Sequence, residues 1–129
     1  MLKTKTQSTA YNLVTDKDMK YSYSETKTGA TWVDGKAIYR RVFKVTNKSL
    51  SYGAVVQSFA KSNFREMVNV RSYMAGSTGD YVTFPRVGSS GKGSGIEYSA
   101  NNNGFIFMGN DTWSEQSTRW VMIIAEYTK

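Results

Sequence analysis

Residues 31–39 read Thr31-Trp32-Val33-Asp34-Gly35-Lys36-Ala37-Ile38-Tyr39, which places an Asp-Gly pair between two apolar, β-prone runs. In this setting an Asp-Gly pair is the strongest short-range sequence signal for a two-residue β-hairpin. A type I′ turn requires positive φ at both central residues, which Gly adopts freely and Asp adopts more readily than most residues. The stretch therefore predicts a hairpin of type I′ and, with it, an all-β domain. The structural residues of this hairpin are Trp32, Asp34, Gly35, Lys36 and Tyr39.

A chain of 129 residues is long enough for one domain and too short for two independent hydrophobic cores. Residues 1–20 are dominated by Thr, Lys, Ser, Gln and Asp, so we expect an extended arm or linker there. The domain itself is expected over residues 21–129. It opens with Tyr21-Ser22-Tyr23, where aromatic and polar residues alternate as in a short strand, and a loop is expected at residues 25–29.

Apolar or alternating runs, separated by clusters of Gly, Asn and Ser, predict further strands. These runs are residues 37–46, 53–59, 67–74, 81–87, 95–99, 105–108 and 119–127. Short strands at regular intervals are typical of a sandwich or barrel and not of βαβ units. We therefore predict an antiparallel β-sandwich, a jelly-roll-like knob of seven or eight strands with an extended N-terminal arm. In the first of these strands, Phe43 and Val45 mark the face expected to point into the core.

Three segments are expected to interrupt the strands. Pro85 cannot donate a ladder hydrogen bond, so its strand lies at an edge, begins at the proline or carries a bulge. Residues 61–67 are compatible with a short helical turn capped by Ser62 or Asn63. Residues 88–95 are Gly and Ser apart from Lys92, which predicts a mobile loop.

The last strand contains Trp120-Val-Met-Ile-Ile-Ala125, which is nearly continuous in apolar residues. Such a run is typical of a strand that is covered on both faces. It indicates either a homo-oligomer, in which this strand is buried between subunits, or a strand that is central within the monomer.

The chain contains no Cys and no His. This composition removes disulfides, thiolate nucleophiles, imidazole bases, the Ser-His-Asp triad and the usual zinc and copper ligand sets. We therefore expect no catalytic residues, no metal and no cofactor, and a protein that is not an enzyme. No apolar run approaches the ~20 residues of a membrane span, and residues 1–6 lack the apolar core of a signal peptide, so no membrane insertion is expected.

A formal net charge of +7 favours polyanionic partners such as nucleic acid, an anionic cell-wall polymer or an acidic protein. The same charge also serves to keep a Tyr-rich surface soluble. Arg40 and Arg41 are the strongest nucleic-acid candidates, but consecutive residues of a strand point to opposite faces and do not form one patch. We therefore expect no nucleic-acid partner.

Two polar loops carry aromatic residues that suit ligand contact. In the first, Trp113 lies beside Asn110 and Asp111, and such a Trp can stack on a sugar ring while Asn and Asp hold its hydroxyls. The alternative is that Trp113 folds under its loop and closes the end of the domain. Tyr98 and Asn101 form a second candidate cluster with the same two interpretations.

Both ends of the domain resemble a C-terminal module of tailed-bacteriophage structural proteins, which occurs in tail-fibre, baseplate and head-fibre chains. The module has a Tyr-Ser start, a Gly-x-x-Trp-x-Asp-Gly-Lys core and a Tyr-Arg pair. It closes with a Gly-Asn-Asp-x-Trp-Ser loop and a strand that ends in Glu-Tyr-Thr-Lys. The matching residues are Gly29, Trp32, Asp34, Gly35, Lys36, Tyr39 and Arg40, then Gly109, Asn110, Asp111, Trp113, Ser114 and 126–129. Ala37 departs from the pattern, which often has Pro there.

This resemblance implies a virion component, a β-sandwich knob that forms a homotrimer and is displayed on the outside of the particle. It implies adhesion to a host-surface glycan or anionic polymer, with the N-terminal arm attaching the knob to other virion proteins. It transfers no catalytic residue, because the shared motif is scaffold. The alternative function is capsid decoration or cementing without a host ligand.

Overall fold

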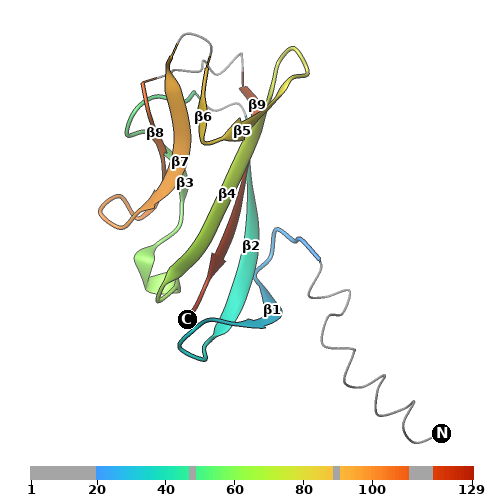
Figure 1. The fold of residues 1–129 in the computed structure, drawn as a ribbon, viewed down its shortest axis with the longest axis vertical. Coiled ribbons are helices and arrows are strands. Elements are labelled where there is room, and N and C mark those ends of the chain that lie inside the picture. The colour runs from blue at the N-terminus through green and yellow to red at the C-terminus, as the bar shows by residue number, and fades with distance from the viewer. Residues whose placement is uncertain (1–19, 47–48, 89–90, 111–117) are drawn as a thin grey trace, which may run out of the picture.

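The computed structural model describes residues 20–46, 49–88, 91–110 and 118–129, which form two antiparallel β-sheets (Figure 1). The strands are β1 Thr26–Thr31, β2 Ala37–Thr46, β3 Val55–Ser58, β4 Met67–Gly76, β5 Tyr81–Phe84, β6 Arg86–Val87, β7 Gly93–Ser99, β8 Gly104–Met108 and β9 Thr118–Tyr127. A 3₁₀ turn, η1, spans Lys61–Asn63. The five-stranded sheet has the order β1-β2-β9-β4-β5, and the four-stranded sheet has the order β3-β8-β7-β6. The predicted all-β fold is confirmed, with nine strands in the described ranges instead of seven or eight.

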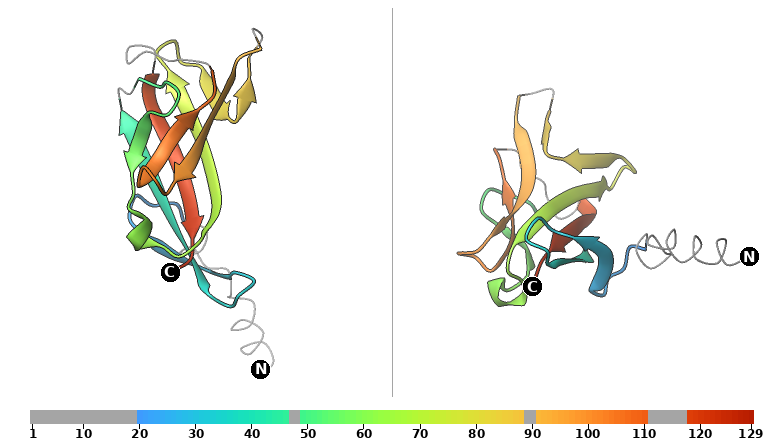
Figure 2. Two further views of the ribbon diagram at one scale, coloured as in Figure 1. Left: turned by 90° about the vertical axis from the view of Figure 1, so that its left-hand side faces the viewer. Right: turned by 60° about the horizontal axis from the view of Figure 1, so that its bottom comes forward.

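One aromatic core joins the two sheets, and Figure 2 shows the four-stranded sheet lying against one face of the long strands β2, β9 and β4. β9 gives every second residue to this core: Val121, Ile123, Ala125 and Tyr127, all fully buried. From the other sheet, Phe105 and Phe107 of β8 are equally buried. Phe43 is buried in the same cluster and Val45 packs against it, which confirms the predicted core face of β2.

β9 is central in its sheet, and this explains the apolar run in its sequence. β2 pairs with it from Tyr39 opposite Tyr127 to Thr46 opposite Trp120, and β4 pairs along its other edge. The monomer therefore accounts for a strand that is paired on both edges and buried on its core face. The outward residues of β9 include Met122 and Ile124, which are half-buried.

Pro85 separates two short strands that belong to different sheets. β5, on its N-terminal side, is the last strand of the five-stranded sheet, and β6, on its C-terminal side, is the last strand of the other. A proline has no N–H for a ladder, so the chain leaves one sheet at this residue and joins the second. The expected edge position of this segment is confirmed, although the single strand predicted over residues 81–87 is divided in two.

The β1–β2 hairpin has a three-residue loop, and the prediction of a two-residue type I′ turn is wrong. Trp32 N–H donates to the Lys36 carbonyl at 2.8 Å, and Gly35 N–H donates to the Trp32 carbonyl at 2.9 Å. Gly35 has φ +84°, whereas Asp34 does not have positive φ. This is the pattern of a type I turn followed by one left-handed residue. Asp34 instead uses its Oδ1 to accept a 3.0 Å hydrogen bond from Lys36 N–H.

Long-range pairing also changes two expectations about loops. Residues 25–29 were expected to form a loop, but β1 begins at Thr26, which pairs with Arg40. The segment forms a strand despite its polar composition, because β2 has an unpaired edge to which it can hydrogen-bond. Residues 93–95 were expected to lie in a mobile loop, but they begin β7 and pair with β6 and β8. Residues 89–90, and residues 1–19 of the expected arm, lie outside the described ranges.

The predicted helical turn is present as η1, but its cap differs. Neither Ser62 nor Asn63 caps it, since Ala60 is the N-cap residue and makes no side-chain cap bond. Instead, Asn103 Oδ1 accepts a 3.0 Å hydrogen bond from Lys61 N–H. A side chain 42 residues away in sequence therefore caps the turn.

Candidate functional site

The segment that precedes β1 lies on the outer face of the five-stranded sheet, opposite the core. Ser22 accepts a 2.9 Å hydrogen bond through its carbonyl from Val42 N–H of β2. Arg41 Nε donates to the Tyr23 carbonyl at 3.1 Å. These two bonds hold the segment against the edge of β2 beyond the point where β1 begins. The short strand expected at Tyr21-Ser22-Tyr23 is not formed, but both tyrosines line the same pocket.

Three aliphatic side chains from two neighbouring strands form the floor of this pocket. Val42 of β2 pairs with Ile124 of β9, and Met122 follows on the same face of β9. Paired residues in an antiparallel ladder place their side chains on the same face of the sheet. The floor is therefore apolar and continuous across the two strands.

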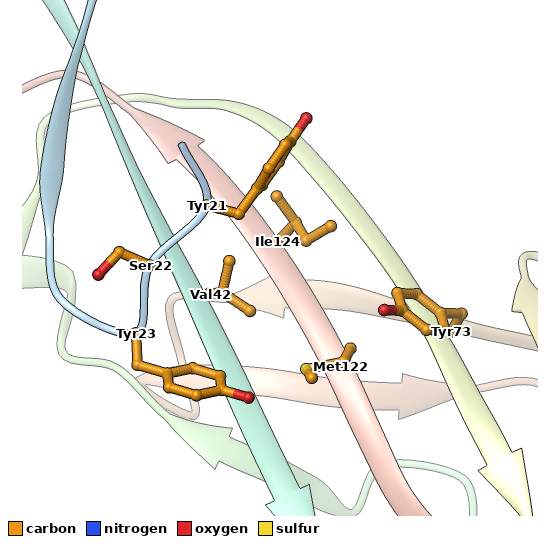
Figure 3. Close-up of a pocket in the computed structure, with 7 residues that line it drawn as sticks. All are labelled: Tyr21, Ser22, Tyr23, Val42, Tyr73, Met122 and Ile124. Atoms are coloured by element: carbon orange, nitrogen blue, oxygen red, sulfur yellow. The ribbon is translucent and has the colours of Figure 1, made fainter. Parts of the chain in front are cut away.

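Three tyrosines stand around this floor (Figure 3). Tyr21 and Tyr23 come from the segment before β1, and Tyr73 comes from β4, where it pairs with Met122. Tyr21 and Tyr23 are 51% and 57% exposed, so their rings are available to solvent. The resulting tyrosine pocket, defined by Tyr21, Ser22, Tyr23, Val42, Tyr73, Met122 and Ile124, has a volume of about 580 Å³. This volume is within the range of small-molecule sites.

Two arginines approach the Tyr21 ring at one end of the pocket. The guanidinium carbon of Arg40 lies 4.5 Å from the ring centre, and that of Arg71 lies 5.8 Å from it. Arg71 Nη2 also donates a 3.2 Å hydrogen bond to the Tyr21 hydroxyl. This bond and the positive charge of Arg71 lower the pKa of Tyr21 from its ordinary value. The cation–π contacts and the hydrogen bond orient the Tyr21 ring over the sheet.

An acidic residue beside the pocket is already paired. Glu126 accepts hydrogen bonds from Nε and Nη2 of Arg40 at 3.2 and 3.0 Å. Its second oxygen accepts a 3.1 Å bond from the Asn69 amide. Its hydrogen bonds are therefore made with Arg40 and Asn69, while its charge also acts on nearby Arg71.

Aromatic residues continue along the outer face past the pocket. Trp120 of β9 packs edge-to-face against Tyr73 at 5.5 Å and against Tyr81 of β5 at 5.9 Å between ring centres. Lys44 Nζ lies 5.8 Å from the Trp120 ring centre. The outer face thus carries a row of aromatic rings flanked by cations, an arrangement that suits stacking and anion contact.

The groups around this pocket can contact a ligand in several ways. In the described ranges, no group of three or more His, Cys, Asp or Glu side chains is placed to hold a metal ion. The pocket offers phenol hydroxyls, ring faces and guanidinium donors around an apolar floor. These groups contribute hydrogen bonds, stacking and charge.

The first candidate cluster from the sequence is described only at Asn110. Asn110 is exposed, and its Oδ1 accepts a 2.8 Å hydrogen bond from Gly93 N–H at the start of β7. Asp111 and Trp113 lie outside the described residues, so their predicted ligand contact stays a prediction.

The second candidate cluster is split between core and surface. Tyr98 packs edge-to-face against Phe64 and Phe105, and its hydroxyl donates a 2.6 Å hydrogen bond to the Phe59 carbonyl. Burial raises the pKa of this phenol. Asn101 is exposed in the turn after β7, at the end of that strand opposite to Asn110. These contacts give the half-buried Tyr98 a structural role, and its ligand contact beside Asn101 stays a prediction.

The hairpin residues make structural contacts. Trp32 Nε1 donates a 3.1 Å hydrogen bond to Glu66 Oε2, which ties the hairpin to the segment before β4. Tyr39 stacks with Tyr127 at 6.5 Å between ring centres. Asp34, Gly35 and Lys36 build the turn described above.

Most of the tyrosine pocket has no signal in the sequence. The available signals were the alternation at Tyr21 and Tyr23 and the apolar run of the last strand. Tyr73 and Arg71 had no local signal, because their place at the pocket depends on the pairing of β4 with β9.

Comparison of the chain with family models, with curated proteins and with solved structures finds no match. A search of the described residues for a helix long and apolar enough to cross a membrane also finds none.

Proposed function

We propose that the chain is a structural protein of a tailed-phage virion, a knob that adheres to a polymer of the host cell surface. The observation that carries this proposal is the tyrosine pocket, an exposed aromatic site with cations at its rim on the outer face of the five-stranded sheet. The resemblance of residues 21–42 and of the C-terminal residues to a module of phage fibre proteins supports the virion location.

The knob is proposed to be a β-sandwich of jelly-roll type. The shared aromatic core and the change of sheet at Pro85 support this description. A sandwich leaves the outer face of each sheet available to solvent or a partner. The tyrosine pocket occupies one of these faces, which is where an adhesive protein needs its contacts.

The proposed ligand is a glycan or an anionic cell-wall polymer. Tyrosine rings present apolar planes that suit the apolar face of a sugar ring, and their hydroxyls supply polar contacts at the same time. The net charge of +7 raises the local concentration of anionic polymers around the knob. We propose binding without turnover, since the pocket is lined by aliphatic side chains, phenols and one serine, which supply contacts to a ligand.

Adhesion is proposed to use several copies at once. A homotrimer attached to the particle through residues 1–20 would present three pockets, and linked weak contacts give an overall affinity far above that of one site. Sedimentation of the purified chain tests this part. A trimer at micromolar concentration is expected, and a monomer contradicts it.

A decorating or cementing role is the second candidate function, and one observation favours it. Met122 and Ile124 are apolar and only half-buried on the outer face, so a neighbouring virion subunit could cover them. In that case the tyrosine pocket would be a protein contact and would bind no glycan.

Binding to arrays of bacterial glycans and to purified cell envelopes separates the two functions. Adhesion predicts saturable binding that is lost in Tyr23→Ala and in Tyr73→Ala, with the folded state verified by circular dichroism. Tyr52→Ala is the control, because Tyr52 is an exposed tyrosine outside the pocket. Trp113→Ala tests the alternative loop site. Binding only to virion proteins, with none to glycans or envelopes, refutes adhesion and favours cementing.

A further inference from the structure

Arg71 is a cation at the rim of the tyrosine pocket that forms no salt bridge among the described residues, although the nearby Glu126 charge acts on it. Its one described hydrogen bond goes to the Tyr21 hydroxyl, a neutral group, at 3.2 Å. The described ion pairs are Arg40 with Glu126 and Lys129 with Glu25. A guanidinium has five N–H donors, so Arg71 keeps donors for a further acceptor after it has bonded Tyr21. Its side chain is exposed on the same face as the pocket.

The charges around the pocket leave a net positive surface. Among the described residues, Glu126 is a carboxylate beside the pocket, and it is bound by Arg40 and by the Asn69 amide. Arg71 lies at the same end of the pocket, and Lys44 lies at the other end, over Trp120. Three cations against one bound carboxylate favour an anionic ligand by charge complementarity.

We infer that the tyrosine pocket selects a sugar ring bearing an acid group, and that Arg71 is the residue that binds this group. The inference rests on the adhesive function proposed above and specifies its ligand. An oxyanion on the ring would accept hydrogen bonds from Arg71 while the ring lies over Val42, Met122 and Ile124. Guanidinium donors in a fixed planar fork match the two oxygens of a carboxylate or phosphate.

The rest of the pocket suits the neutral part of such a ligand. In Figure 3 the hydroxyls of Tyr23 and Tyr73 point toward each other across Met122. Neither hydroxyl has a hydrogen bond with a described residue, so both can bond ring hydroxyls. The ring faces and the apolar floor cover the nonpolar side of a sugar. A fully neutral glycan would leave the donors of Arg71 unused, which is the basis of the selectivity.

The test compares ligands that share their sugar rings and differ in whether they carry an acid group. Trigalacturonic acid and its fully methyl-esterified form have the same rings, and glucose 6-phosphate against glucose provides the phosphate counterpart. Binding is measured by NMR on the full chain, and the methyl signals of Met122 and Ile124 locate the ligand at the pocket. The acidic form of at least one pair is expected to bind about tenfold or more tightly than its neutral partner, as for one charged hydrogen-bonded contact. The pair that shows the effect identifies the acid as carboxylate or phosphate.

Two variants assign the effect to Arg71. Arg71→Gln is expected to abolish the preference, so that the acidic and the neutral ligand of a pair bind with equal affinity. Tyr21→Phe keeps the ring and removes the hydroxyl that Arg71 bonds, and it is expected to retain the preference. An equal loss of preference in Tyr21→Phe would show that Arg71 acts only by positioning Tyr21, and this would overturn the inference.

The remaining outcomes separate the inference from the proposed function. Equal affinity for acidic and neutral ligands overturns the inference, and adhesion stands if glycans still bind at the pocket. Absence of saturable binding of both acidic probes at millimolar concentration also overturns the inference. In that case the glycan arrays and envelopes decide adhesion separately.

Discussion

Glu25 and Tyr127 are 102 residues apart in sequence, and the Tyr127 hydroxyl donates a 2.7 Å hydrogen bond to Glu25 Oε1. The other oxygen of Glu25 accepts a 2.6 Å bond from Lys129 Nζ. Tyr127 is fully buried at the end of β9, and Glu25 directly precedes β1. One carboxylate thus connects the start of the described domain to its last strand, near the segment that carries Tyr21 and Tyr23.

Removing the Tyr127 hydroxyl is expected to destabilise the domain. Tyr127→Phe keeps the ring in the core but leaves Glu25 without its buried donor, so the free energy of unfolding is expected to fall by about 1–2 kcal/mol. Urea unfolding measures this change. Tyr39→Phe is the control, because the Tyr39 hydroxyl has no hydrogen bond with a described residue. Equal effects of the two substitutions would contradict a special role for the Glu25 contact.

The same carboxylate predicts a loss of stability in acid. Burial alone would raise the pKa of Glu25, but the hydrogen bonds from Lys129 and Tyr127 outweigh it and hold the pKa below its ordinary value of 4.5. A carboxyl with a lower pKa in the folded state stabilises that state above its unfolded pKa, and this contribution is lost as pH falls through the folded pKa. As pH is lowered below 4.5, the urea concentration at the midpoint of unfolding is expected to fall more steeply for the wild type than for Glu25→Gln. Parallel curves for the two proteins would refute this linkage.

A side chain at Gly104 is expected to disrupt the contact between β8 and β3. A Cβ there would lie 2.6 Å from the Gln57 carbonyl oxygen, and this backbone atom cannot move without breaking the ladder. Gly104→Ala is expected to lower the free energy of unfolding by about 1–3 kcal/mol. Gly95→Ala, whose Cβ would meet the Pro85 side chain at an ordinary 3.7 Å, serves as the control in the same denaturation assay. Unchanged stability of the Gly104 variant would show that β3 adjusts to the added methyl group.

The Glu126 carboxylate is expected to contribute to stability beyond the level of a surface ion pair. Its side chain is 17% exposed, and it bonds both Arg40 and Asn69. Glu126→Gln keeps the shape but removes the charge, and a loss of about 1–2 kcal/mol is expected. Thermal unfolding of this variant is compared with that of Glu97→Gln, which changes an exposed Glu of β7. A loss no larger than that of Glu97→Gln would place the pair among ordinary surface salt bridges.

Several features of the fold followed from local patterns. The core face of β2 was predicted through Phe43 and Val45, because side chains alternate along a strand whatever its partners are. The edge position at Pro85 was predicted because a missing N–H excludes a central place in any sheet. The hairpin was placed correctly at Asp34-Gly35, since left-handed backbone is available to Gly in any context.

Other features depended on which strands become neighbours. The loop length of the hairpin follows from the bond between Trp32 N–H and the Lys36 carbonyl, and residues 25–29 became part of β1 because β2 has a free edge. A local pattern contains no information about the register between distant strands. A polar segment can also form a strand when a neighbouring strand has an unpaired edge.

The candidate site shows most clearly which features follow from local sequence and which depend on strand pairing. By itself the sequence determined the composition of the site: abundant tyrosines, an excess of cations, no imidazole or thiol, and two tyrosines on one side of a short segment. Only the tertiary structure decided that Arg71 contacts Tyr21 and that Tyr73 lines the same pocket, because β9 lies between β2 and β4 and brings their outer faces together. Side-chain chemistry is a property of each residue, whereas a pocket is a property of the sheet register.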